Sequence, residues 1–235
     1  MVMHKLFIFG DSIFKGVTYS GETGRYSLFK SSLASRLAEH GIKLINSSKM
    51  GATIDKGIEI MNADLAECGD GDTVLIEYGG NDCNFDWKKV SENPDGEFSP
   101  RTEESAFREQ YGIAIEKARK TGAKVFASTL FPLDSEKFFG YITKGLDPDG
   151  ILHWLGDKFE LYRWQEYYSS LVQDIAHKHG CQVIDLRSDI AKLHNLPSLV
   201  CDDGIHPTLK AHEMIENILY NFFVPESERL PEALA

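Results

Sequence analysis

Short apolar runs alternate with longer amphipathic stretches along this chain. A run without polar alternation is typical of a strand buried on both faces of a parallel sheet, and five such runs occur, at 5–9, 42–45, 73–78, 123–128 and 181–186. Apolar residues at helical spacing predict helices between and after these runs, over 27–40, 55–66, 103–121, 159–179 and 208–222. The alternation predicts an α/β fold, a three-layer α/β/α sandwich around a five-stranded parallel sheet.

Two segments, 83–100 and 131–158, interrupt this alternation. Each follows a predicted strand, so both are expected at the rim formed by the carboxyl ends of the strands, where open parallel sheets place their active sites. The second segment is rich in aromatic residues, which predict either a lid or wall around a substrate or a packing or dimer surface. We expect one domain over residues 1–235 with these two insertions. The sequence does not decide between a monomer and a homodimer.

Composition, net charge and cysteine pattern exclude several classes of protein. Of the 235 residues, 42% are hydrophobic and 26% charged, which is typical of a globular protein. The formal net charge of -11 disfavours nucleic acid as a partner. The four cysteines form no CxxC pair, which argues against a structural zinc site. The first apolar run is too short for a signal peptide, and no stretch approaches the roughly 20 apolar residues of a membrane span, so we expect a cytoplasmic protein.

Four short motifs follow predicted strands or precede the last predicted helix. They are Gly10-Asp11-Ser12, Asn46-Ser47-Ser48-Lys49-Met50-Gly51, Gly79-Gly80-Asn81-Asp82 and Asp203-Gly204-Ile205-His206. The first three follow the first three predicted strands, so they are expected at one rim of the sheet. They would bring a hydroxyl, an amide and several backbone N–H groups together there.

Ser12, His206 and Asp203 have the residue types of a nucleophilic catalytic site. A serine hydroxyl becomes a good nucleophile when a neighbouring base takes its proton, and neutral histidine is the usual base near pH 7. The histidine needs a carboxylate that fixes its tautomer. Asp203 precedes His206 by three positions, within reach of one tight loop, and this spacing favours it over its neighbour Asp202. The non-catalytic interpretation of Ser12 is a helix N-cap.

An ester hydrolase also needs fixed donors for the oxyanion that forms during attack. The backbone N–H groups of Ser12 and Gly51 and the side-chain amide of Asn81 would supply them. Glycine at position 51 allows the backbone to approach a substrate closely. The alternative is structural, because Gly51 and Asn81 are also residue types common in turns.

The four motifs resemble those that define the SGNH/GDSL hydrolase family, in the family's order, and they span residues 9–207. The resemblance implies a flavodoxin-like sandwich and Ser-His-Asp catalysis by Ser12, His206 and Asp203. It also implies an oxyanion hole shared by Ser12, Gly51 and Asn81, with no metal ion and no cofactor. Two positions depart from the family pattern: Ser48 stands where members often carry glycine, and Ile13 where leucine is frequent.

The sequence therefore predicts a serine ester hydrolase, an esterase or acylhydrolase acting on a small-molecule ester with a small or medium acyl group. A carbohydrate O-deacetylase with the same triad is one alternative. A non-catalytic module that binds carbohydrate or lipid is a second alternative from another class, which an intact triad disfavours.

Overall fold

The computed structural model describes residues 4–229, so residues 1–3 and 230–235 of the predicted domain lie outside the described part. Its central sheet has five parallel strands in the order β4-β1-β5-β6-β7. Their bounds are β1 His4–Gly10, β4 Ile42–Asn46, β5 Thr73–Glu77, β6 Lys124–Ser128 and β7 Gln182–Ile184. This is the flavodoxin-like strand order, and it confirms the predicted fold class.

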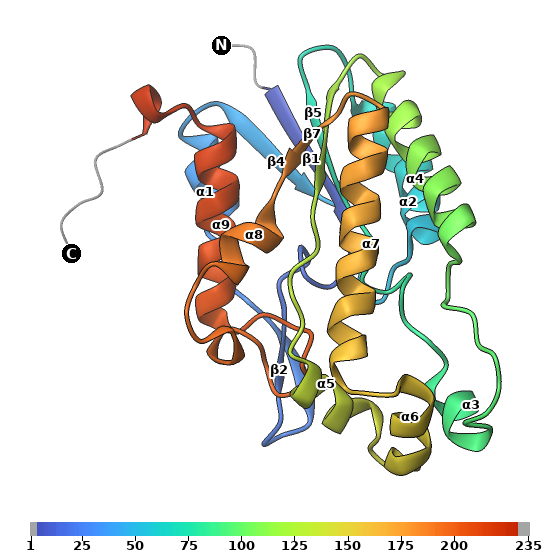
Figure 1. Cartoon of the computed structure of the whole chain (residues 1–235). Helices are drawn as coiled ribbons and strands as arrows, with labels where there is room; N and C mark the ends of the chain where they lie inside the picture. Colours follow the sequence, from blue (N-terminus) through green and yellow to red (C-terminus); the bar gives the residue numbers. More distant parts are fainter. Residues whose placement is uncertain (1–3, 230–235) are drawn as a thin grey trace.

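Helices cover both faces of this sheet (Figure 1). One layer contains α2 (Ile54–Asp64), α4 (Glu104–Arg119) and α7 (Phe159–Lys178), and the other contains α1 (Leu33–Ala38), α8 (Leu186–Ala191) and α9 (Leu209–Phe223). Successive side chains of a strand point to opposite faces, so Phe7 and Phe9 of β1 join the core under the first layer while Leu6 and Ile8 join the core under the second. Burial on both faces explains why this strand has no polar alternation.

The two predicted rim insertions contain short helices of their own. Segment 83–100 carries α3 (Trp87–Glu92), and segment 131–158 carries α5 (Ser135–Ile142) and α6 (Pro148–Leu155). Helix α3 packs against α6, and α5 packs against α7, beyond the carboxyl ends of the strands (Figure 1). A third apolar core, which includes Trp87, Phe138 and Leu161, holds this part of the rim together.

The predicted helix over 27–40 is wrong in its first half. Residues Arg25–Leu28 form strand β3, which pairs antiparallel with β2 (Val17–Ser20) in a hairpin that the sequence analysis missed. Helix α1 begins only at Leu33, where the carboxylate of Glu216 on α9 accepts hydrogen bonds from the backbone N–H groups of Ser32 and Leu33. A partner this distant in sequence fixes the start of α1, so local periodicity could not locate it.

The strand predicted over 181–186 is shorter in the structure. Strand β7 ends at Ile184, and Asp185 caps α8 by accepting a hydrogen bond from the N–H of Ser188 at 3.2 Å. Single turns of 3₁₀ helix occur at Leu65–Glu67, Leu196–Ser198 and Glu226–Glu228. All four cysteines are free thiols. Within residues 4–229, no helix combines the length and apolar character that a membrane crossing requires.

Candidate active site

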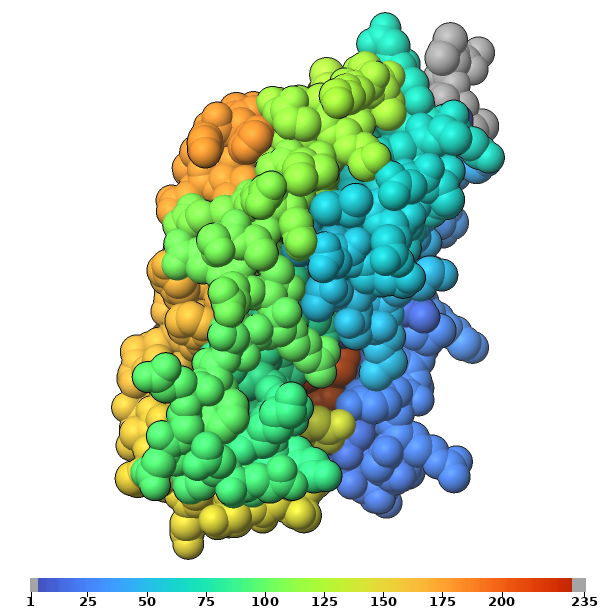
Figure 2. All heavy atoms as spheres, turned by 90° about the vertical axis from the view of Figure 1, so that its right-hand side faces the viewer, coloured from blue at the N-terminus to red at the C-terminus, as the bar shows by residue number. Residues whose placement is uncertain are grey.

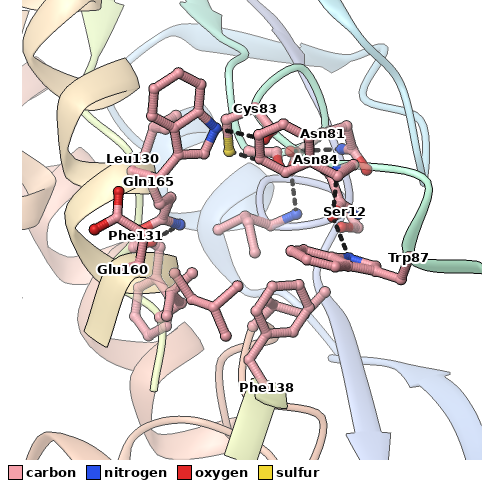
Figure 3. Close-up of a pocket in the computed structure, with 18 of the residues that line it drawn as sticks. Ser12, Asn81, Cys83, Asn84, Trp87, Leu130, Phe131, Phe138, Glu160 and Gln165 are labelled. Carbon is pink, nitrogen blue, oxygen red and sulfur yellow. Dashed lines mark hydrogen bonds between the residues drawn. The ribbon is translucent and has the colours of Figure 1, made fainter. Parts of the chain in front are cut away.

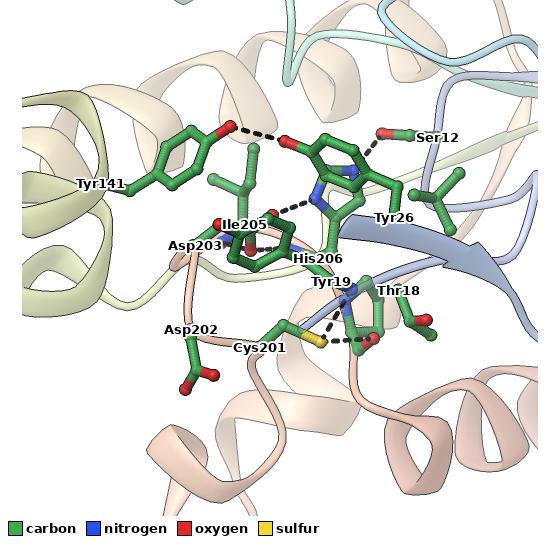
Figure 4. Close-up of polar contacts among 12 residues, drawn as sticks. Ser12, Thr18, Tyr19, Tyr26, Tyr141, Cys201, Asp202, Asp203, Ile205 and His206 are labelled. Carbon is green, nitrogen blue, oxygen red and sulfur yellow. Dashed lines mark hydrogen bonds and ion pairs between the residues drawn. The ribbon is translucent and has the colours of Figure 1, made fainter. Parts of the chain in front are cut away.

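The carboxyl end of β1 and the loop before α9 bring Ser12, His206 and Asp203 together (Figure 4). The Ser12 hydroxyl lies 2.9 Å from His206 Nε2, and His206 Nδ1 lies 2.6 Å from Asp203 Oδ2. Their exposed fractions are 7%, 3% and 0%, so water competes little with these hydrogen bonds. With the Nδ1 proton donated to Asp203, Nε2 is free to accept the serine proton.

The conformation of the 203–206 loop directs the side chains of Asp203 and His206. Asp203 Oδ1 accepts hydrogen bonds from the backbone N–H groups of Ile205 and His206, at 3.2 and 3.1 Å. Gly204 has φ +79°, and a Cβ there would lie 2.1 Å from the backbone nitrogen of Phe138 on α5. This position therefore requires glycine, which lets the loop pack directly against the rim.

Electrostatics keeps Asp203 ionised. Burial by itself raises the pKa of this carboxyl. The hydrogen bonds that it accepts and the charge of His206 outweigh burial, so the pKa lies below its usual value. Asp202, the competing carboxylate, is exposed, and its Oδ2 accepts a hydrogen bond from the N–H of Gly21 at 3.0 Å instead.

The three candidate oxyanion donors come from three motifs that contact one another. Within residues 4–229, neither the Ser12 nor the Gly51 backbone N–H has a hydrogen-bond partner. The Asn81 amide donates to Asp11 Oδ2 at 2.9 Å and to the Ala52 carbonyl at 3.1 Å, which ties its motif to both of the others. An Asn81 contact to the oxyanion therefore requires one of these amide hydrogens to be shared with the substrate oxygen.

The loop that carries Gly51 is held in place despite Ser48. Lys49 N–H donates to the Gly10 carbonyl at 3.0 Å, and Gly51 itself adopts φ +73°, a conformation that favours glycine. Gly51 is exposed at the rim, with open space where a side chain would be. Its N–H is thus available to a substrate.

A buried pair of carboxyl groups, Asp11 and Glu77, lies next to Ser12, and Glu77 was not singled out from the sequence. Glu77 Oε2 accepts a hydrogen bond from the Asp11 N–H at 3.2 Å. Burial raises the pKa of Asp11 to about 6, and burial together with the Asp11 charge raises the pKa of Glu77 well above its usual value. Glu77 therefore favours its protonated form more than an exposed glutamate does. Its signal in the sequence is a lone acid in an otherwise apolar strand.

Asp11 and Asp82, which belong to the first and third motifs, shape the rim through hydrogen bonds to the backbone. Asp11 Oδ1 accepts a hydrogen bond from the Ile13 N–H at 2.8 Å. Asp82 Oδ1 accepts from the Ile54 N–H at the start of α2 and from the Thr102 hydroxyl, at 3.0 and 2.7 Å. Burial raises the pKa of Asp82 to about 6.

Comparison with known proteins decides the family. The model of the GDSL-like lipase/acylhydrolase family matches residues 8–214. The chain belongs to this family. Membership places it among the hydrolases that act on ester bonds, and it confirms the predicted enzyme class and the resemblance on which that prediction rested.

Solved structures support the same fold for this GDSL-type hydrolase. The acetylxylan esterase Axe2 from Geobacillus stearothermophilus has 18% sequence identity and a TM-score of 0.65, with 97% of this chain and 99% of that chain covered. The lipase/acylhydrolase from Enterococcus faecalis has 18% identity and a TM-score of 0.62, with 94% and 95% covered. The acetyl xylan esterase AlAXEase has 23% identity and a TM-score of 0.62, with 94% and 100% covered. No curated protein matches the chain.

The missed hairpin covers the histidine of this GDSL-type hydrolase. Tyr26 of β3 places its ring edge-on to the His206 imidazole, and its hydroxyl lies 2.6 Å from the Tyr141 hydroxyl of α5 (Figure 4). Tyr19 of β2 packs against both tyrosines, with ring centroids 5.0 and 5.5 Å away. The hairpin and α5 thus form a tyrosine cluster beside the His206 imidazole.

A cavity of about 360 Å³ opens beside Ser12, under the rim helices (Figure 3). Its walls are mainly apolar and include all three tryptophans of the chain, Trp87, Trp154 and Trp164. On the outside, the surface is hollowed between the blue N-terminal part and the green rim segment, and red atoms of the C-terminal part are visible within the hollow (Figure 2). The aromatic segment lines this cavity, which favours the wall interpretation over a dimer surface.

Proposed function

We propose that the protein is a serine ester hydrolase in which Ser12 is the nucleophile, His206 the general base and Asp203 its orienting carboxylate. The observation that carries the proposal is the continuous hydrogen-bond chain from the Ser12 hydroxyl through the imidazole to the buried carboxylate. All three groups lie at the rim of the sheet, next to a cavity large enough for a substrate.

In the first half-reaction, the Ser12 Oγ attacks the ester carbonyl carbon while His206 Nε2 takes the hydroxyl proton. The Asp203 carboxylate stabilises the resulting imidazolium. The negative charge develops on the former carbonyl oxygen, towards the free N–H groups of Ser12 and Gly51 and the Asn81 amide. The intermediate then collapses, the bond to the alcohol oxygen breaks, and His206 gives that oxygen its proton.

In the second half-reaction, water replaces the alcohol. His206 removes a proton from the water as it attacks the acyl carbon, and the bond to Ser12 Oγ breaks as the imidazolium returns the proton to the serine. The products are the carboxylic acid and the free enzyme. The low exposure of His206 and Asp203 keeps this proton transfer within the triad.

A carbohydrate O-deacetylase with the same triad is the second candidate. Two of the solved structures that share the fold are described as acetylxylan esterases, and this favours acetylated xylo-oligosaccharides as substrates to test. The substrate is in either case a small-molecule ester. A cytoplasmic setting is part of the proposal, because the cysteine pattern of the sequence does not resemble a secreted disulfide framework.

The direct test is turnover of p-nitrophenyl butyrate by a Ser12→Ala variant. We expect kcat to fall by about 10⁴-fold or more, because the nucleophile is gone while the fold is unaffected. Ser170→Ala, which removes an exposed serine hydroxyl on α7, is the matched control and should retain full activity. Unchanged turnover by folded Ser12→Ala protein would refute the proposal.

A further inference from the structure

The cavity beside Ser12 lies on one particular side of the nucleophile. Asp11, Gly80 and Asn81 line it. Ile205, the neighbour of His206, also lines it, but His206 itself does not. The leaving alcohol of an ester must face His206, because that imidazole supplies its proton. The substituent on the other side of the carbonyl carbon, the acyl chain, is then directed away from the histidine and into the cavity.

The dimensions of the cavity exceed what an acetyl group fills. A closed apolar cavity of about 150 Å³ already accommodates benzene, and this one measures about 360 Å³. A single methyl group would leave most of the apolar wall uncovered. A longer chain would bury that wall and gain transition-state binding for each methylene that it adds.

The charges around the cavity also restrict its occupant. Its lining contains the acidic residues Asp11, Glu77 and Glu160, of which Glu77 favours its protonated form, and includes no lysine, arginine or histidine. Ser12 and Glu160 lie on opposite sides of the space in Figure 3, so an anionic group at the far end of an acyl chain would approach a carboxylate. Glu160 is already paired with Arg163, at 2.7 Å.

We propose that this cavity is the acyl site and that the preferred acyl group is neutral and of medium length, about six to eight carbons, rather than acetyl. The inference rests on the proposed function, because it assumes that Ser12 forms the acyl-enzyme. Three tryptophans and several phenylalanines provide the contact surface for the chain.

The first experiment compares kcat/KM for p-nitrophenyl acetate, butyrate, hexanoate and octanoate, which differ only in the acyl part. We expect a gain of about three- to fourfold per buried methylene, and thus about 10²-fold from acetate to hexanoate. The p-nitrophenyl monoester of adipic acid carries a six-carbon acyl group with a terminal carboxylate. Its kcat/KM should be at least tenfold lower than that of the hexanoate ester. Equal or better turnover of acetate would overturn the inference.

A variant that fills part of the cavity tests whether the acyl chain of the substrate binds there. Leu155, the last residue of α6, is half-buried and lines the cavity, so Leu155→Trp should occupy part of its volume. We expect kcat/KM to fall about tenfold or more for hexanoate and octanoate and less than about twofold for acetate. The matched control is Ile113→Trp, at a side chain on α4 that is 46% exposed and outside the cavity. This variant should change kcat/KM neither for the long-chain esters nor for acetate. Equal losses for all esters would contradict the assignment.

Tryptophan fluorescence provides a readout that needs neither turnover nor the Leu155 variant. Because all three tryptophans line the cavity, methyl octanoate added to Ser12→Ala protein should shift or quench the emission, and methyl acetate at the same concentration should not. Identical responses to both esters would overturn the inference. Ser12-dependent turnover without a chain-length preference would overturn this inference alone, whereas no Ser12-dependent turnover of any ester would overturn the proposed function as well.

Discussion

The edge of the Tyr26 ring lies against the imidazole of His206, with ring centroids 5.3 Å apart and planes inclined by 68° (Figure 4). Tyr26 is itself 39% exposed, whereas His206 is almost completely buried. The tyrosine thus separates the His206 imidazole from bulk water on this side. Its hydroxyl is held by Tyr141, so strand β3 and helix α5 fix its position together.

We predict that Tyr26→Ala lowers kcat/KM for p-nitrophenyl butyrate by about tenfold, because the imidazole loses both a packing partner and its shield from water. Tyr26→Phe keeps the ring and removes only the hydroxyl pair, so it should stay within about threefold of the wild type. Thermal unfolding of both variants would show whether the hairpin stays folded. A folded Tyr26→Ala protein with wild-type kinetics would show that the ring contributes nothing to catalysis.

We propose that the Asn81 amide contacts the oxyanion, and the same amide ties Asp11 to Ala52. We predict that Asn81→Ala lowers kcat by about 10²–10³-fold with a smaller change in KM, since the amide contact strengthens as the oxyanion forms. Steady-state kinetics with p-nitrophenyl butyrate measures the loss. Asn62→Ala, on the exposed face of α2, is the control and should have no effect. A loss below about threefold would leave Asn81 only its role of tying Asp11 to Ala52.

The Asp11–Glu77 pair predicts a pH-dependent stability. Burial raises the pKa of Glu77, so the folded protein keeps this proton at pH values at which the unfolded chain has released it. Folding then takes up a proton, and the contribution of Glu77 to the free energy of unfolding falls as the pH rises above the usual glutamate pKa. Glu77→Gln needs no proton, so its stability relative to the wild type should increase as the pH rises above the usual glutamate pKa, by up to about 1.4 kcal/mol per pH unit.

Urea unfolding at several pH values tests this prediction. Glu213→Gln, at an exposed position on α9, should follow the wild-type profile throughout and is the matched control. If the difference between Glu77→Gln and the wild type stays constant with pH, Glu77 is ionised in the folded protein and the description of the pair is wrong.

The sequence was sufficient to predict the sheet and to bring the triad residues together. Each of the first three motifs follows an apolar strand, and the ends of parallel strands meet at one rim, so the sequence alone predicts that Ser12 and Asn81 lie at this rim. His206 and Asp203 are close in sequence, and a single loop sets their mutual geometry. The catalytic roles of these residues and of Gly51 remain predictions.

The features that the sequence did not reveal depend on contacts between distant segments. The hairpin at 17–28 was hidden because its partners, the 201–206 loop and α5, come more than a hundred residues later. The aromatic segment could not be assigned to a wall or an interface, because tryptophans such as Trp154 and Trp164 have the same spacing in either case. Their common orientation towards one cavity becomes visible only in three dimensions.

The central claim is that Ser12 is an activated nucleophile, and covalent labelling tests it most directly. The intact protein would be treated with a fluorophosphonate, and the modified residue located by mass spectrometry of its peptides. We predict one phosphonate per chain, on Ser12, and its loss in the His206→Ala variant, because the hydroxyl then has no base at 2.9 Å. An unlabelled wild-type protein, or a label on another residue with Ser12 unmodified, would contradict the account.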